Sequence, residues 1–124
     1  MKEISMLDNT LTINYNASAI VMTRMKEGNY SSEYRGVNGS DKLVLSISHT
    51  MPSNRGGSGA SHLVRLDVEY YDVEGTYLRT ESAWQVVKTF DNSQVDTTAK
   101  YTAEALHDVA ADATLLGKII AGES

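Results

Sequence analysis

The sequence contains no cysteine, a single proline and no long run of apolar residues. The absence of cysteine excludes disulfide bonds and thiolate metal ligands. No segment approaches the roughly 20 consecutive apolar residues that cross a bilayer, and the first residues lack the apolar stretch of a secretory signal peptide. The 124 residues are enough for one hydrophobic core. We therefore expect a single domain over residues 1–124, synthesised in the cytosol.

A basic excess is also missing, because the formal net charge is −5. This argues against a protein that holds nucleic acid through a uniformly positive surface. The charges are unevenly distributed, however. Residues 1–60 contain six Lys and Arg against five Asp and Glu, whereas residues 61–124 contain five against eleven. A locally basic surface is therefore compatible with the acidic total.

Alternation of polar and apolar side chains is present over most of the chain and predicts β-strands. In residues 1–27 we expect an N-terminal hairpin, with strands Leu11–Tyr15 and Ser18–Met25 joined at Asn16-Ala17. In residues 31–91 we expect an antiparallel sheet in which each strand follows its neighbour, made of Ser31–Arg35, Asp41–Met51, Ser61–Tyr71 and Tyr77–Phe90. Asn38-Gly39 and Glu74-Gly75 are typical of tight turns in such a sheet.

Helical periodicity replaces the alternation in residues 97–122. Asp96 or Thr97 can cap a first helix, Asp112 can cap a second, and Gly122 can end it. The second helix is too short to be stable alone, so we expect it to pack on another surface. The order of parts predicts an α+β fold with its helices at the end.

Strand Asp41–Met51 has an apolar side and a polar side, because side chains alternate with period two. The polar side holds Lys42, Val44, Ser46, Ser48 and Thr50. Together with Arg65, and with Trp84 and Lys88, such side chains can contact phosphates, ribose and unpaired bases. The competing interpretation is an ordinary solvated sheet face. Periodicity does not decide which face of the Trp84 strand is buried.

Other candidate sites give weaker signals. The glycine-rich segment Arg55–Gly59 lacks the ending of a phosphate-binding loop and is expected to be a plain connection between strands. His49 and His62 flank that segment and can approach each other, but we expect these two and His107 to be ordinary structural or surface histidines. The acidic series Asp67, Glu69, Asp72 and Glu74 is expected to be solvated, with calcium at a subunit contact as the alternative.

The order of these parts resembles the coat proteins of the small single-stranded RNA bacteriophages, the levivirus group. The resemblance rests on KLVLSISHTMPSNRGGSGASHLVRLDVEYYD, TYLRTESAWQVVKTF and the helical TTAKYTAEALHDVAADATLLGKIIAG, and it covers nearly the whole chain. It implies an intertwined dimer in which two five-stranded sheets join into one continuous ten-stranded sheet. It further implies a T=3 icosahedral shell around genomic RNA, formed in the cytoplasm of a bacterial host, and binding of an operator stem-loop that represses translation.

Site residues follow from this resemblance by position. The RNA-binding residues would be Lys42, Ser46, Ser48, Thr50, Arg65, Trp84 and Lys88. The dimer interface would bury Leu106, Val109, Leu115, Leu116, Ile119 and Ile120, and the inter-dimer loop would contain Asp72, Glu74, Gly75 and Tyr77. No catalytic residue, cofactor or resident metal is implied.

A second function class stays open at this stage. The chain can be a small cytosolic α+β enzyme or ligand-binding domain, with a pocket between sheet and helices and with Asp67 and Glu69 as working acids. Assembly separates the two classes, because a coat protein forms large RNA-containing particles and an enzyme of this size does not.

Overall fold

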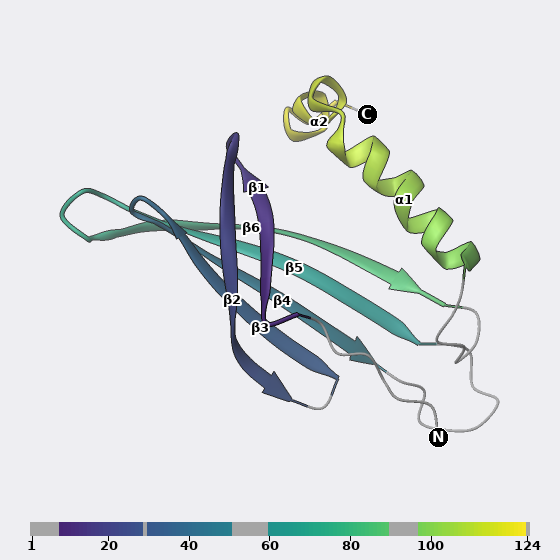
Figure 1. Ribbon diagram of the computed structural model, residues 1–124. Helices are drawn as coiled ribbons and strands as arrows, with labels where there is room; N and C mark the ends of the chain where they lie inside the picture. Colours follow the sequence, from purple (N-terminus) through teal and green to yellow (C-terminus); the bar gives the residue numbers. More distant parts are fainter. Residues whose placement is uncertain (1–7, 29, 51–59, 90–96, 124) are drawn as a thin grey trace. The chain divides into compact units, whose positions relative to one another are not determined.

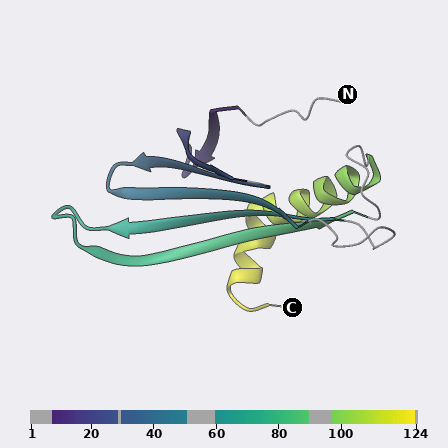
Figure 2. The same ribbon diagram turned by 90° about the horizontal axis from the view of Figure 1, so that it is seen from below.

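The computed structural model describes residues 8–28, 30–50, 60–89 and 97–123. The chain divides into two compact units, one of residues 1–50 and 62–86 and the other of residues 51–61 and 87–124. Six antiparallel strands follow one another in a single sheet (Figures 1 and 2). They are β1 (Thr10–Tyr15), β2 (Ser18–Gly28), β3 (Ser31–Asn38), β4 (Asp41–Thr50), β5 (Ser61–Tyr71) and β6 (Tyr77–Lys88).

Strand β2 connects the hairpin to the rest of the sheet by using two different partners. Its first half pairs with β1 from Ser18 to Thr23, and its second half pairs with β3 from Thr23 to Gly28. The register shifts between Arg24 and Lys26, which is a β-bulge. A bulge bends a strand, so β1 and the first half of β2 run across the direction of β3 to β6 (Figure 1). The predicted separate hairpin and sheet are therefore one six-stranded sheet.

The bend brings the hairpin onto one face of the sheet. Ile20 and Met22 of β2 form one buried cluster with Tyr34, Leu43, Leu45 and Val68. Gly36 of β3 permits this close approach, because a Cβ at that position would lie 2.6 Å from Met22 Sδ and 3.0 Å from the carbonyl oxygen of Val21. The Tyr34 hydroxyl, whose side chain is fully buried, donates a hydrogen bond to the carbonyl oxygen of Asp8 over 2.6 Å. We call this side of the sheet the core face.

Two tight turns fix the register at the start of the sheet. Asn16 and Ala17, with φ of 50° and 63°, form the predicted two-residue turn between Tyr15 and Ser18. Both angles are positive, as a type I′ turn requires. The next predicted turn is shifted by one residue, because Asn38 pairs with Asp41 and the loop is Gly39-Ser40, with Gly39 at φ +63°.

The second unit contains the helices α1 (Thr97–Ala111) and α2 (Ala113–Ile120). The predicted cap is confirmed, since Asp112 Oδ1 accepts a hydrogen bond of 3.0 Å from the amide of Leu115. Gly122, at φ +89°, ends α2 as predicted, and its amide donates to the carbonyl of Ile119. Neither described helix has the length and apolar character needed to span a membrane.

Candidate nucleic-acid interface

The side of the sheet opposite the core face carries most of the predicted RNA-binding residues, and we call it the open face. Alternation along β4 places Lys42, Val44, Ser46, Ser48 and Thr50 there, because Leu43 and Leu45 belong to the core cluster. Side-chain contacts extend the open face across β5 and β6. Lys42 contacts Tyr71 of β5, and Arg65 and Asp67 of β5 contact residues of β6.

Arg65 and Trp84 form the aromatic centre of the open face. The Arg65 guanidinium carbon lies 5.6 Å from the centroid of the Trp84 ring, within the range of a cation–π interaction. The Trp84 side chain is nevertheless 64% exposed. This contact settles the face of β6 that the periodicity left undecided, and it leaves a large aromatic surface available for stacking.

A carboxylate limits the positive charge at this centre. Asp67 Oδ1 accepts a hydrogen bond of 3.0 Å from Arg65 Nε and a second one from the Ser82 hydroxyl. The ion pair is solvent-accessible, so its net contribution to stability is small, roughly 0–1 kcal/mol. Arg65 can therefore exchange the carboxylate for a phosphate oxygen at low cost, although Asp67 repels an approaching polyanion.

A second cation lies further along the open face. Lys42 Nζ is 4.6 Å from the centroid of the Tyr71 ring. The Tyr71 hydroxyl donates a hydrogen bond of 2.9 Å to Glu69 Oε1, and this bond raises the pKa of Tyr71 above its ordinary value. Tyr71 thus stays neutral and presents its ring to the Lys42 ammonium group, whose charge faces solvent.

Strand β3 adds a pair of residues that the sequence analysis missed. Arg35 pairs with Val44 across the ladder and Glu33 with Ser46, so both side chains lie on the open face. Arg35 Nε donates to Glu33 Oε2 over 3.0 Å, in an exposed ion pair like that of Arg65 and Asp67. The turn between β3 and β4 was the signal that could have placed them, since it fixes which residues lie opposite the polar side of β4.

Part of the open face is apolar. Val44, which the sequence placed among the polar side chains, is buried. It lines a hollow of about 660 Å³ between β2, β3 and β4, together with Val21, Met25, Arg35, Val37 and Lys42. The face therefore combines an apolar hollow at its β2 side with charged and aromatic groups towards β6.

The remaining predicted RNA-binding residues have different surroundings. Ser46 and Ser48 are half-buried, and Thr50 is exposed. Lys88 is exposed at the end of β6 but belongs to the second unit, so it is not assigned to the same surface as Arg65 and Trp84.

The predicted dimer residues are exposed in the single chain. All six apolar side chains keep more than a third of their surface accessible, and α2 contains no buried residue. They are Leu106, Val109, Leu115, Leu116, Ile119 and Ile120. An amphipathic helix of eight residues with its apolar side exposed lacks the packing that stabilises helices in proteins.

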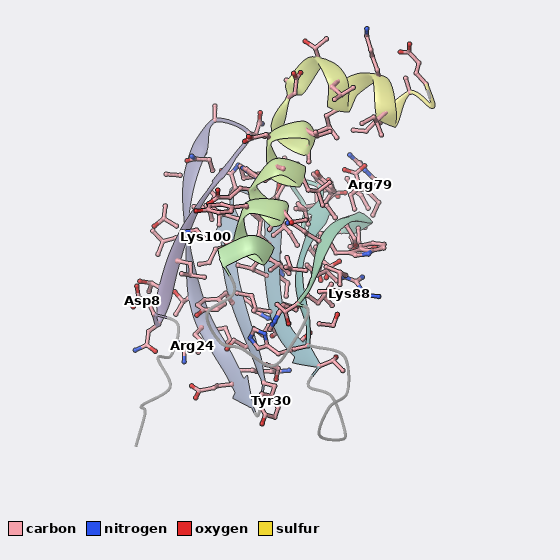
Figure 3. All side chains as sticks on the ribbon, turned by 90° about the vertical axis from the view of Figure 1, so that its right-hand side faces the viewer. Asp8, Arg24, Tyr30, Arg79, Lys88 and Lys100 are labelled. Atoms are coloured by element: carbon pink, nitrogen blue, oxygen red, sulfur yellow. The ribbon has the colours of Figure 1, made fainter. Side chains whose placement is uncertain are left out.

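The predicted inter-dimer loop is a compact turn between β5 and β6. Asp72 Oδ1 accepts hydrogen bonds of 2.9 Å from the amides of Glu74 and Thr76, and Gly75 adopts φ +88°. Tyr77 begins β6, and its ring packs edge-on against the Tyr71 ring, with 5.7 Å between the ring centroids. Figure 3 shows Arg79, close to this turn, and Tyr30, at the turn between β2 and β3, towards opposite ends of the sheet.

Among the described residues, no group of three or more His, Asp or Glu side chains is placed to hold a metal ion. A calcium ion between subunits stays a prediction. The segment Arg55–Gly59 lies outside the described residues. His49 and His62 do approach each other, as their positions on either side of that segment allowed, and their Nδ1 atoms are 2.8 Å apart.

Solved structures of phage coat proteins share this fold at low sequence identity. The virus-like particle of bacteriophage AVE019 matches with a TM-score of 0.60 and 10% identity, over 94% of this chain and 97% of that one. The bacteriophage EMS014 coat protein matches with 0.59 and 11%, over 89% and 78%. An unassembled virus coat protein dimer, described as a bacteriophage RNA-binding dimer, matches with 0.51 and 14%, over 93% of both chains.

Curated proteins yield no match to the sequence. A family model does match it: that of the phage phiCb5 coat protein, over residues 8–90, which is well over half of the chain. The match includes all six strands and therefore the whole open face. The chain belongs to the phage phiCb5 coat protein family, and it is a structural protein rather than the small enzyme that its composition alone left open.

Proposed function

We propose that the chain is the subunit of an icosahedral phage capsid, that it forms obligate homodimers, and that the open face contacts the enclosed genomic RNA. The observation that carries the RNA part is the exposed Trp84 ring beside the Arg65 guanidinium. An exposed aromatic ring can stack any unpaired base, and an adjacent guanidinium can contact the phosphate next to that base. The coat protein family supports a place in the virion.

Two unpartnered features support the dimer. Strand β6 is an edge of the described sheet, and backbone groups along its outer side can pair with another strand. Two copies joined along β6 would produce the continuous sheet that the resemblance implies. The exposed apolar side of α2 supplies the second contact, because burial of each large aliphatic side chain contributes roughly 1.5–3 kcal/mol.

Charge balance on the open face suggests what kind of RNA contact to expect. Arg65 and Arg35 each have a carboxylate partner, so their positive charge is largely compensated within the face. A compensated face favours contacts that depend on base stacking and hydrogen bonding over contacts that depend on charge alone. We extend the proposal to an RNA stem-loop operator, whose unpaired loop bases are the groups that Trp84 can stack.

Expression of the chain alone tests the proposal. The expected product elutes as megadalton particles, contains nuclease-protected host RNA, and shows closed shells by negative-stain microscopy. Dissociation should yield dimers, and a folded monomer at micromolar concentration would contradict the obligate dimer. Particles without RNA would contradict the RNA contact while leaving the shell intact.

A further inference from the structure

His49 and His62 form a close pair outside the open face. His49 is the last residue but one of β4, and His62 is the second residue of β5, so the two adjoin the connection between these strands. Alternation places both on the core side, because His49 is an even number of residues from Leu45 in β4 and His62 is an even number from Val68 in β5. Their Nδ1 atoms are 2.8 Å apart, and their rings meet edge to face with centroids at 5.0 Å.

The separation of the two nitrogen atoms matches a particular metal geometry. Metal–imidazole bonds are about 2.0–2.1 Å long. Two ligands at 90° around a square-planar or octahedral ion are then roughly 2.8–3.0 Å apart, whereas two ligands of a tetrahedral ion are roughly 3.3–3.4 Å apart. The 2.8 Å of the hydrogen-bonded pair already falls in the range for adjacent positions of a square-planar or octahedral ion, so the two atoms need not move apart to bind one.

We propose that His49 and His62 form a two-nitrogen site for a divalent transition-metal cation of the copper or nickel type, with water in the remaining positions. Imidazole nitrogen is a preferred ligand of such ions, and square-planar coordination by nitrogen and oxygen is typical of them. Calcium is excluded as the ion bound by this pair, because calcium binds through oxygen ligands.

The exchange of the proton for the metal conserves charge on both rings. In the hydrogen-bonded pair, one ring carries its proton on Nδ1 and the other accepts with an unprotonated Nδ1. On metal binding the first ring releases that proton to solvent and takes one up on Nε2, so both rings stay neutral. Two metal–nitrogen bonds then replace one hydrogen bond.

The site can be tested with Cu²⁺ on the full-length protein at neutral pH after nuclease treatment. Electron paramagnetic resonance should detect two nitrogen ligands per bound ion in the wild type. We expect His49→Gln and His62→Gln each to weaken Cu²⁺ binding by at least about tenfold, because the second ligand acts at high effective concentration once the first is bound. His107→Gln, which changes an exposed histidine of α1, is the matched control and should bind as the wild type does.

A second measurement needs no variant and so does not depend on the folding of one. Bound Cu²⁺ should protect His49 and His62 of the wild type from acylation by diethylpyrocarbonate, read by mass spectrometry, and should leave His107 reactive. Excess Ca²⁺ should not compete. The proposal is overturned if the single substitutions leave the two-nitrogen signal intact, or if Cu²⁺ protects neither histidine.

Discussion

Gly36 lies directly against Met22, so closely that a Cβ on Gly36 would be 2.6 Å from the Met22 sulfur. This contact is what allows β2 to fold back over β3. Met22 is flexible and can yield to some extent, but the Val21 carbonyl at 3.0 Å is backbone and cannot be repacked without moving the strand. The position therefore limits how closely the hairpin can cover the core face.

We expect Gly36→Ala to destabilise the protein by about 1–3 kcal/mol, the usual cost of overpacking a close contact. The measurement is chemical or thermal unfolding. Gly117→Ala is the matched control, because a Cβ at that position in α2 meets no atom within 4 Å. Alanine is the better helix former by about 1 kcal/mol, so this control should be neutral or stabilising. Equal effects of the two substitutions would contradict the packing argument.

Trp84 provides its own probe, since it is the only tryptophan in the sequence. Single-stranded RNA should quench its fluorescence. Trp84→Ala should weaken RNA binding by about 1–3 kcal/mol, the range for loss of one base–aromatic stack. Tyr30→Ala is a suitable control, because Tyr30 is an aromatic residue of similar exposure, 60%, at the turn between β2 and β3. RNA affinity that is insensitive to Trp84→Ala would place the contact elsewhere.

A substitution at Asp67 is expected to strengthen RNA binding instead of weakening it. Asp67→Asn removes the negative charge beside Arg65 and keeps a group that can accept from Ser82. RNA affinity should rise by about 1 kcal/mol at low salt, and the gain should shrink as salt is added. The control Glu81→Gln alters a similar pair, Arg79 with Glu81, on the other side of the sheet, where Arg79 lies over the Tyr70 ring. A gain from Glu81→Gln of the same size would show a general charge effect instead of a contact on the open face.

Ile119 tests the apolar side of α2. Ile119→Asp should shift the dimer towards dissociation, because burial of this side chain is worth roughly 1.5–3 kcal/mol and a carboxylate in its place must be desolvated. Sedimentation analysis at decreasing concentration measures the shift. Thr114→Glu places the same charge in the first turn of α2, where the helix dipole favours it, and should leave the dimer unchanged. An unaltered dimer in Ile119→Asp would remove α2 from the interface.

Local features of the fold were predictable from the sequence because they depend on few neighbouring residues. The turn at Asn16-Ala17 forms where expected. Asp112 caps α2 as expected, because the cap needs only its own side chain and the backbone amide of Leu115, three residues later. The two partners of β2 were not predictable, because alternation reports the faces of a strand and not its neighbours. A glycine inside a strand, Gly36, was the one local sign of a close approach.

The candidate site shows the same division. Alternation placed Lys42, Ser46 and Ser48 on one face correctly, but it could not show that Val44 is buried there. The face of Trp84 depends on its contact with Arg65, nineteen positions earlier in the sequence. The approach of His49 and His62 was foreseeable, because they flank the connection between two successive strands, but the direct contact of their Nδ1 atoms was not.

The pair of histidines also predicts how stability depends on pH. Burial, and to a smaller extent the charge of His62, lowers the pKa of His49 below its ordinary value of 6.5. In the unfolded chain His49 takes up a proton as the pH falls through 6.5, whereas in the folded chain it resists doing so. The unfolded state then binds more protons, so stability is fully present above 6.5 and is lost as the pH falls towards the folded pKa.

Thermal unfolding between about pH 7.5 and 5.5 measures this loss, in a range where most carboxylates are still ionised. The melting temperature of the wild type should fall across the range, and His49→Gln should flatten the curve because glutamine does not titrate. His107→Gln should retain the slope of the wild type, since His107 is exposed on α1. The opposite result, in which the melting temperature of His49→Gln still falls fully with pH while that of His107→Gln does not, would contradict this prediction. The pH dependence would then come from α1, and the pairing of His49 with His62 would have no effect on stability in this range.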